Sequence, residues 1–233
     1  MDPPHTEYLV VAPHPDDAEL GMGGTIAHLL SRGKSVAVVD LTSGEPTPFG
    51  TREKRREETL AACQVLGIEH RVNLGLPNRA LEATLEARAA LAEVYRAFRP
   101  RVLFVPYWRD AHPDHVAATE LAIAARFHAK LTKTDMKGEP HYPERILHYY
   151  CTHLRRHDDV AFVADISEHF EAKIRAVECY QSQFYEGRGH DAASVTDYVR
   201  TLCRYWGSVV GCTYGEPFAS QELLGLATPE CIL

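Results

Sequence analysis

The sequence has no apolar run that approaches the ~18 residues of a membrane span, so we expect a protein with no membrane partner. Its start, Met1-Asp2-Pro3-Pro4, has neither the basic region nor the apolar region of a secretory signal. Cysteine is sparse for 233 residues, with six scattered positions and no C-x-x-C pair. A chain of this size can bury enough apolar surface to fold without disulfides. We therefore expect a cytoplasmic protein whose thiols are reduced and mostly structural.

Positive charge is also in short supply, since 32 Asp and Glu face 25 Lys and Arg and give a formal net charge of −7. Nucleic-acid binding draws on clustered Lys and Arg, so this balance argues against a nucleic-acid partner. The densest basic run, residues 52–56, is followed directly by Glu57 and Glu58. We expect this run to form a mixed-charge helix face rather than a binding patch.

What the sequence does contain is a regular alternation of strand and helix patterns. Short apolar runs predict buried strands, whereas apolar residues at helical spacing, ended by Gly or Pro, predict helices. The predicted strands are 8–12, 36–41, 71–74, 102–105, 146–151 and 160–164. The predicted helices are 21–30, 52–66, 81–98, 115–129, 167–181 with Ser167 as its cap, and 198–209. This order predicts an α/β fold with three α/β/α layers and a mostly parallel sheet. No linker divides the chain, so we expect one domain over residues 1–233.

Two four-residue clusters carry most of the chemistry. The first cluster, His14-Pro15-Asp16-Asp17, follows the first predicted strand, and the second cluster, His112-Pro113-Asp114-His115, follows the strand at 102–105. Ligands of open α/β sheets bind beyond the carboxyl ends of the strands, so both clusters are expected at the same edge. A single His-Pro-Asp is often only a turn. Two of them at one sheet edge favour an active site.

The residue types in the two clusters suit a catalytic metal site. Zn²⁺ takes imidazole and carboxylate ligands and keeps a position open for water, and His14, Asp17 and His115 can supply that set. Asp16 would then be free to act as a general base. His112 could donate a proton or stabilise an oxyanion, and Asp114 could hydrogen-bond His112 and fix its tautomer. Most other histidines are expected to be ordinary surface or core groups, among them His5, His70, His141, His153, His157 and His169.

A competing signal comes from the glycines at 21, 23 and 24, which open a helix after the first strand, with Asp40 near the end of the second strand. This arrangement loosely matches a dinucleotide-binding fingerprint. However, the G-x-G-x-x-G spacing is absent and residues 14–20 intervene before the glycines. We therefore expect the glycines to let the helix approach the sheet closely.

Residues 12–24 and 110–115 together resemble the PIG-L/LmbE-like family of zinc-dependent N-acetylglucosamine deacetylases. Further similar segments include Asp40-Leu41-Thr42, Arg55-x-x-Glu58 and Tyr180-x-Ser182-Gln183-Phe184. The resemblance is strongest to the bacillithiol-biosynthesis branch, which acts on N-acetylglucosaminyl malate. It implies a Rossmann-like fold, hexamers built from trimers, and the same roles for the two clusters as the chemistry suggests.

The resemblance also implies three substrate-binding residues. Arg55 matches an arginine that contacts the sugar, although its alternative is an ion pair with Glu58 on one helix face. Arg145 matches an arginine that approaches the base Asp16. Tyr198 matches a tyrosine near the reacting carbonyl. Substrate specificity is expected in the loops at 42–51, 130–143 and 185–195, the second of which could be a lid.

The sequence therefore predicts a metal-dependent N-deacetylase that removes acetate from an N-acetylglucosamine conjugate, with Zn²⁺ or Fe²⁺ as its cofactor. Two alternatives stay open. Two histidines and one carboxylate also describe the site of non-haem Fe(II) enzymes. A metal- or sugar-binding protein without turnover would carry the same ligands.

Overall fold

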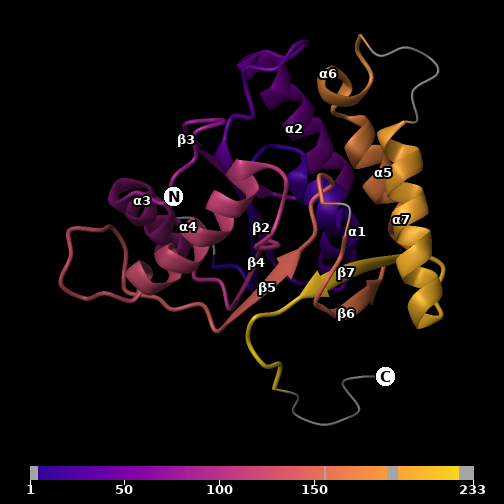
Figure 1. Cartoon of the computed structure of the whole chain (residues 1–233). Helices are drawn as coiled ribbons and strands as arrows, with labels where there is room; N and C mark the ends of the chain where they lie inside the picture. Colours follow the sequence, from indigo (N-terminus) through magenta and orange to yellow (C-terminus); the bar gives the residue numbers. More distant parts are fainter. Residues whose placement is uncertain (1–4, 155, 188–193, 226–233) are drawn as a thin grey trace.

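The computed structural model describes residues 5–154, 156–187 and 194–225, and its strands form one seven-stranded sheet (Figure 1). The order across the sheet is β3-β2-β1-β4-β5-β7-β6. The strands are β1 (Tyr8–Ala12), β2 (Val36–Thr42), β3 (His70–Leu76), β4 (Val102–Pro106), β5 (Arg145–Tyr149), β6 (Val160–Asp165) and β7 (Gly215–Ala219). The strands from β3 to β5 pair in parallel, and β7 pairs antiparallel with β5 and β6.

The central strand β1 lies between β2 and β4, and Tyr8 is level with both Val36 and Val102. The carboxyl ends of β1 and β4 are therefore neighbours. The first cluster follows β1 and the second cluster follows β4, so this register brings the two clusters together at one edge of the sheet, as predicted.

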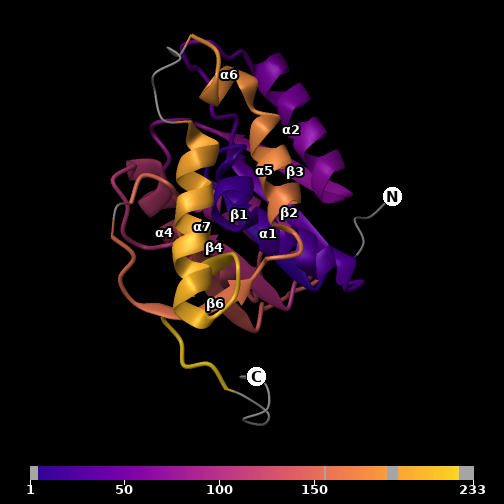
Figure 2. The ribbon, with the colours of Figure 1, turned by 90° about the vertical axis from the view of Figure 1, so that its right-hand side faces the viewer.

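Helices cover both faces of the sheet (Figures 1 and 2). The helices are α1 (Asp17–Ser31), α2 (Arg52–Leu66), α3 (Leu85–Phe98), α4 (Pro113–Ala129), α5 (Phe170–Glu178), α6 (Gln181–Phe184) and α7 (Val195–Val210). Alternate side chains of β1 point to opposite faces. Leu9 and Val11 join the core under α3 and α4, whereas Val10 and Ala12 join the core under α1, α2 and α5. The predicted three-layer α/β fold is confirmed.

The glycines at the start of α1 have a packing role. A Cβ at Gly21 would lie 2.4 Å from the Tyr149 ring, and one at Gly24 would lie 2.7 Å from Ile166. Only glycine fits at such distances, so α1 lies close against the sheet and α5. Asp40 is 2% exposed and its two oxygens accept hydrogen bonds from Arg71 at 2.8 Å each. Asp40 is therefore not available to a ribose, which removes the basis of the dinucleotide alternative.

The second half of the chain differs most from the prediction. Strand β7 was missed, because its sequence GEPFA has only two apolar side chains among a Gly, a Glu and a Pro. Ser167 was wrongly predicted to cap a helix. Helix α5 begins three residues later, and the Ser167 hydroxyl instead accepts the backbone N–H groups of Thr213 and Tyr214, just before β7.

Residues 130–143 form a loop, one of the two predicted alternatives, but the loop does not lie at the edge of the sheet where a lid or a specificity loop would be. This loop joins the end of α4 to the start of β5, so it lies at the amino ends of the strands, opposite the two clusters. The buried Arg96 holds the loop by donating hydrogen bonds to the carbonyl groups of Ala129, Leu131, Met136 and Gly138. The loop is therefore a fixed connection rather than a lid.

The five cysteines in the described ranges are free, and Cys63, Cys151 and Cys203 are buried, in line with structural thiols. None of the helices within residues 5–154, 156–187 and 194–225 has the length and hydropathy of a bilayer-spanning segment. The prediction of one domain over residues 1–233 includes positions outside these ranges and stays a prediction.

Candidate active site

The two clusters line one open cavity of about 310 Å³ at the carboxyl ends of the strands. The first cluster contributes His14, Asp16 and Asp17, and the second contributes His112 and His115. The remaining lining comes from the start of the 42–51 loop and α2, the loop after β3, the loop after β5, and α6: Gly44, Pro46, Thr47, Arg55, Asn78, Arg79, Thr152, His153, Gln183 and Phe184, with Leu20 of α1. The cavity is thus assembled from segments far apart in the sequence.

Asp17 lies between two imidazole rings at the floor of this cavity. Its Oδ2 atom is 3.0 Å from His14 Nδ1 and 3.4 Å from His115 Nε2, and all three residues are at most 9% exposed. Burial acts to raise the pKa of Asp17, but the charge and hydrogen bonds of His115 and His14 hold that pKa well below its ordinary value. Burial acts to lower the pKa of His115, but the charge of Asp17 raises it well above its ordinary value.

This arrangement fits a divalent metal ion. His14, Asp17 and His115 each offer one donor atom, and these three atoms lie within 4.8 Å of one another. A buried carboxylate shared by two imidazoles calls for positive charge between them, which a metal ion or protons can supply. Two further groups have the same compactness: one joins His14 to His112 and Asp114, and the other joins His115 to Asp110 and Cys151. Only in the group of His14, Asp17 and His115 does one carboxylate oxygen face a nitrogen of two histidines, and this group has the predicted ligands.

Asp16 combines a strained backbone with a perturbed carboxylate. It precedes α1 with φ 127°, a conformation that non-glycine residues rarely adopt. Its Oδ2 atom accepts a hydrogen bond of 2.8 Å from Arg55 Nη1. Burial raises the pKa of Asp16 to about 6, against the opposing charge of Arg55. A raised carboxylate pKa together with backbone strain is typical of catalytic positions.

The Arg55 side chain is buried and points to the first cluster rather than to Glu58 on its own helix. It donates to Pro15 O at 2.9 Å as well as to Asp16, and its Nε atom is 3.5 Å from Glu45. The alternative ion pair with Glu58 is not formed. Glu58 instead accepts the backbone N–H and the hydroxyl of Ser182, at 2.7 and 2.8 Å, and so joins α2 to α6.

The Asp114 carboxylate was predicted to hydrogen-bond the His112 ring, but only the backbone of Asp114 does so. The backbone N–H of Asp114 donates to His112 Nδ1 at 3.2 Å, because His112 is the N-cap residue of α4. A neutral imidazole with Nδ1 as acceptor carries its hydrogen on Nε2. The Asp114 carboxylate instead accepts the backbone N–H groups of Arg79 and Leu81 and lies 3.1 Å from His14 Nε2. It therefore positions His14 and anchors the loop after β3.

Asp110 is a residue whose role the sequence analysis missed. One of its oxygens accepts the backbone N–H of His112 at 2.8 Å, and the other lies 3.1 Å from His115 Nδ1. A carboxylate at the outer nitrogen of a metal-binding histidine fixes the tautomer and orientation of the ring. The signal in the sequence was the position of Asp110, two residues before the second cluster on the same loop.

His153 was expected to be an ordinary histidine, because the sequence places it far from both clusters, but it lines this cavity. The chain after β5 brings its ring to 5.5 Å, between centroids, from both His112 and His115. Asn78 also lines the cavity, and its Oδ1 atom is buried without a hydrogen-bond partner among the residues that the structure describes. A single sequence gives no signal for either residue, since neither belongs to a motif.

Two predicted substrate residues are not brought to this cavity. Arg145 begins β5 and is level with Val102, at the amino end of the sheet, where its side chain is exposed. The arginine next to Asp16 is Arg55. Tyr198 of α7 lines a neighbouring hollow with His157, Leu202, Tyr205 and Trp206. The 185–195 loop lies partly outside the described residues.

Comparisons with known proteins agree with this geometry. The family model described as "PIG-L: GlcNAc-PI de-N-acetylase" matches residues 9–126, a range that includes both clusters. The diacetylchitobiose deacetylase of Thermococcus kodakarensis is 32% identical over 89% of this chain and 80% of its own. A probable N-acetyl-alpha-D-glucosaminyl L-malate deacetylase of Bacillus subtilis is 29% identical over 75% of this chain and 82% of its own.

A solved structure with a similar fold has a higher sequence identity to this chain than these two relatives. The crystal structure of the conserved protein TT1542 from Thermus thermophilus is 41% identical, covers 96% of this chain and 98% of that chain, and has a TM-score of 0.86. The family model covers half of the chain, and the Thermococcus relative extends the match through most of the rest. The chain therefore belongs to the PIG-L family and is an amide-hydrolysing enzyme of that family, as its two His-Pro-Asp clusters predicted.

Proposed function

We propose that this protein removes the N-acetyl group from an N-acetylglucosamine-containing substrate, using a Zn²⁺ ion held by His14, Asp17 and His115. The observation that carries the proposal is the shared position of Asp17 between two imidazoles, with Asp16 and His112 on the wall of the same cavity. Fe²⁺ is an alternative metal for the same ligands. The bound metal would polarise the acetamide carbonyl and lower the pKa of water.

Asp16 acts as the general base in this proposal. Its carboxylate takes a proton from the water that attacks the carbonyl carbon. The same proton then passes to the nitrogen as the C–N bond breaks, since an unprotonated amine is a poor leaving group. The products are acetate and a free amino sugar, so the atoms of one water are accounted for. The hydrogen bond from Arg55 Nη1 at 2.8 Å keeps the Asp16 side chain in one orientation.

His112 stabilises the charge that develops on the carbonyl oxygen. Its Nδ1 atom is occupied by the backbone N–H of Asp114, which leaves the Nε2 hydrogen as the donor for an oxyanion. Hydrogen-bond donors that are already oriented stabilise the transition state without a free-energy cost for reorientation. Asp110 and Asp114 act indirectly, as positioning residues for His115 and His14.

The sugar ring is held by further groups that line the cavity. Arg55 of α2 is the proposed contact for the sugar hydroxyls, and Asn78 lines the same cavity. The group attached to the sugar is the open part of the substrate. The relatives named above act on diacetylchitobiose and on a malate conjugate. N-acetylglucosaminyl malate and N,N'-diacetylchitobiose are therefore both candidate substrates. That the protein forms a homo-oligomer, a hexamer by the family resemblance, stays a prediction.

A substrate panel tests the proposal. Acetate release is measured from N-acetylglucosamine, N,N'-diacetylchitobiose and N-acetylglucosaminyl malate, with protein stripped by a chelator and then reloaded with Zn²⁺ or Fe²⁺. We expect stoichiometric acetate and amine from at least one substrate, only after metal is restored. Oxygen consumption with Fe²⁺ in place of acetate release would favour the non-haem iron alternative. Metal binding without product from any N-acetyl sugar would favour a binding protein.

A further inference from the structure

The Arg55 side chain lies between two buried carboxylates, those of Asp16 and Glu45. Glu45 belongs to the 42–51 loop and is 5% exposed. One of its oxygens is 3.5 Å from Arg55 Nε, which makes the contact an ion pair rather than a hydrogen bond. On the other side, Arg55 Nη1 donates a hydrogen bond of 2.8 Å to Asp16. The guanidinium group therefore connects the proposed base to a carboxylate from a different segment.

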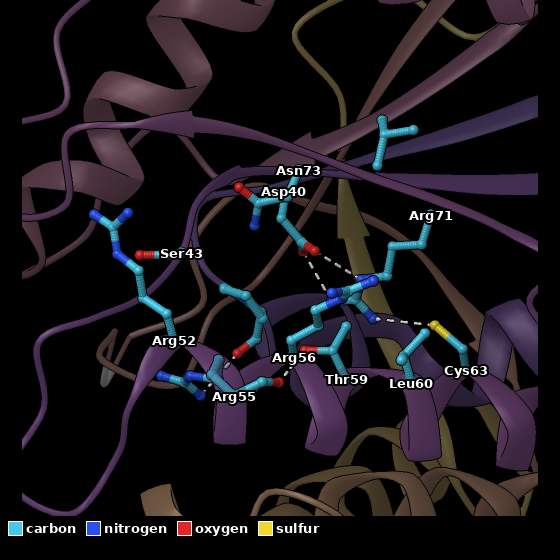
Figure 3. A pocket seen from close by; sticks show the side chains of 12 residues that line it. Asp40, Ser43, Arg52, Arg55, Arg56, Thr59, Leu60, Cys63, Arg71 and Asn73 are labelled. Atoms are coloured by element: carbon cyan, nitrogen blue, oxygen red, sulfur yellow. Dashed lines mark hydrogen bonds and ion pairs between the residues drawn. The ribbon is translucent and has the colours of Figure 1, made fainter.

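A third carboxylate near Arg55 is already paired with another arginine. A pocket of about 370 Å³ between α2 and the ends of β2 and β3 is lined by Arg55, Asp40 and Arg71 among others. Asp40 accepts two hydrogen bonds of 2.8 Å from Arg71, which Figure 3 shows as dashed lines. The orientation of the Arg55 side chain therefore depends on Asp16 and Glu45 rather than on Asp40.

The 42–51 loop is shaped around the ion pair of Arg55 and Glu45. A Cβ at Gly44 would lie 2.9 Å from Arg55 Nη2, and a Cβ at Gly50 would overlap a carboxylate oxygen of Glu45. Gly44 also has a positive φ of 72°, which favours glycine. The two glycines therefore leave the space that the guanidinium group and the carboxylate occupy.

Glu45 is itself held in place by other hydrogen-bond donors. The backbone N–H of Thr47 donates to its Oε2 atom at 2.6 Å, and the Thr47 hydroxyl donates at 2.9 Å. The Gln183 side chain of α6 donates to Oε1 at 3.3 Å. Because these neighbours and Arg55 all offer hydrogens, the position suits a carboxylate, whose two oxygens both accept. Glu45 is thus fixed well enough to orient Arg55.

This orientation divides the N–H groups of Arg55 between support and substrate. Nη1 donates to Pro15 O and to Asp16, and Nε faces Glu45. Nη2 makes no hydrogen bond among the residues that the structure describes. A guanidinium group is planar, so fixing two of its nitrogens also fixes the third. Since Arg55 lines the active-site cavity, Nη2 is left to donate to a sugar hydroxyl.

We propose that Glu45 is a positioning residue that acts through Arg55, by holding the guanidinium group in the plane that orients the Asp16 carboxylate and directs Nη2 to the sugar. Glu45 is not among the residues that line the active-site cavity, so it acts through another side chain. The inference rests on the proposed function, in which Asp16 is the base and Arg55 contacts the sugar. It gives the 42–51 loop a part in orienting the base.

A double-mutant cycle tests whether Glu45 acts through Arg55. Acetate release gives kcat and KM for the native protein, Glu45→Gln, Arg55→Ala and the double variant. A misplacement of about 1 Å can cost ~10²-fold, so Glu45→Gln should lower kcat by roughly ten- to a hundredfold and raise KM. In the Arg55→Ala background, the same substitution should change kcat by less than about twofold. No loss in Glu45→Gln, or an equal loss in both backgrounds, would overturn the proposal.

Two variants control for charge and for folding. Glu57→Gln removes the same charge from the exposed face of α2 and should keep the native kcat and KM. Glu45→Asp keeps the negative charge on a shorter side chain, so it should retain more of the native kcat than Glu45→Gln. The unfolding temperature shows which variants are folded, and the cycle is run with Glu45→Asp if Glu45→Gln is not. Equal kcat in the two Glu45 variants would contradict a role for the charge.

Crystal structures of the native protein and of Glu45→Gln decide the inference without any turnover. We expect the guanidinium group of Arg55 to turn in the variant, so that the contact between Nη1 and Asp16 lengthens beyond the hydrogen-bond range of about 3.2 Å. A contact that stays at 2.8 Å would overturn the proposal. If the native protein releases acetate from no N-acetyl sugar, the proposed function fails, and the two crystal structures still determine whether Glu45 positions Arg55.

Discussion

The two His-Pro-Asp clusters share three residues in a row but differ in backbone. In the first cluster, α1 begins only at Asp17, and Asp16 before it has φ 127°. In the second cluster, α4 begins at Pro113 directly after His112, which has an ordinary φ of −88°. The helix thus starts after His-Pro-Asp in one cluster and within it in the other.

This difference separates an aspartate suited to chemistry from one suited to support. The backbone of Asp16 is strained, its carboxylate accepts a hydrogen bond from one arginine, and burial raises its pKa to about 6. Asp114 lies in the first turn of a helix and its carboxylate accepts two backbone N–H groups. Burial acts to raise the pKa of Asp114, but these hydrogen bonds and His14 lower it instead. The same three residues thus give a carboxyl group with a raised pKa in one backbone and one with a lowered pKa in the other.

Asp16→Asn is the change with the largest expected effect. Asparagine keeps the size of the side chain and tolerates positive φ, but it cannot take a proton, so turnover should fall by roughly 10²–10⁴. The rate of acetate release measures this, and metal analysis should give the same metal content as in the native protein.

The matched control is Asp135→Asn, an exposed aspartate in the 130–143 loop at the opposite edge of the sheet. Its turnover should equal that of the native protein. Near-native turnover in Asp16→Asn would exclude Asp16 as the base and remove the main contrast between the two clusters.

Asp110→Asn should have the next largest effect, on metal affinity. The variant weakens the contact of 3.1 Å at His115 Nδ1, so the ring loses its fixed orientation. Loss of such a supporting carboxylate weakens metal binding by about 10–100-fold. Competition with a chromophoric chelator measures the dissociation constant. An unchanged constant would mean that the backbone of α4 alone positions His115.

The sequence predicted the layers, the parallel centre of the sheet and the meeting of the two clusters, because all of these depend on local patterns. The apolar run at residues 8–12 and the glycine at 67 are such signals, and β1 and the end of α2 lie where they indicated. Strand β7 was missed because its sequence GEPFA carries no local strand pattern, and only its pairing with β5 and β6 makes it a strand.

The details of the site depend on long-range contacts that a single sequence does not encode locally. Glu58 could have paired with Arg55 on the helix, yet Ser182, 124 positions away, takes its carboxylate. His153 reaches the site only because β5 ends beside β4. Arg145 was assigned to the site by resemblance alone, and the register of β5 puts it at the opposite edge of the sheet.

Exchanging glycine and alanine tests the backbone difference between the clusters directly. At position 16 the positive φ favours glycine, so Asp16→Gly should be more stable than Asp16→Ala by about 1 kcal/mol. At position 114, inside a helix, Asp114→Ala should be more stable than Asp114→Gly by roughly 0.5–1 kcal/mol. Both variants at each position lose the same carboxylate, so the difference isolates the backbone. Urea unfolding measures it, and the same sign at both positions would contradict the comparison.

Arg145→Ala is expected to have the smallest effect. Its side chain is exposed at the amino end of β5, so the free energy of unfolding should change by less than ~0.5 kcal/mol and turnover should not change. Arg55→Ala should instead lower turnover, because Arg55 holds Asp16 at 2.8 Å. Steady-state kinetics of the two variants separates these outcomes. A strong loss of turnover in Arg145→Ala would mean that Arg145 acts in a different active site, that of a neighbouring copy in an oligomer, and the active site described for one chain would then be incomplete.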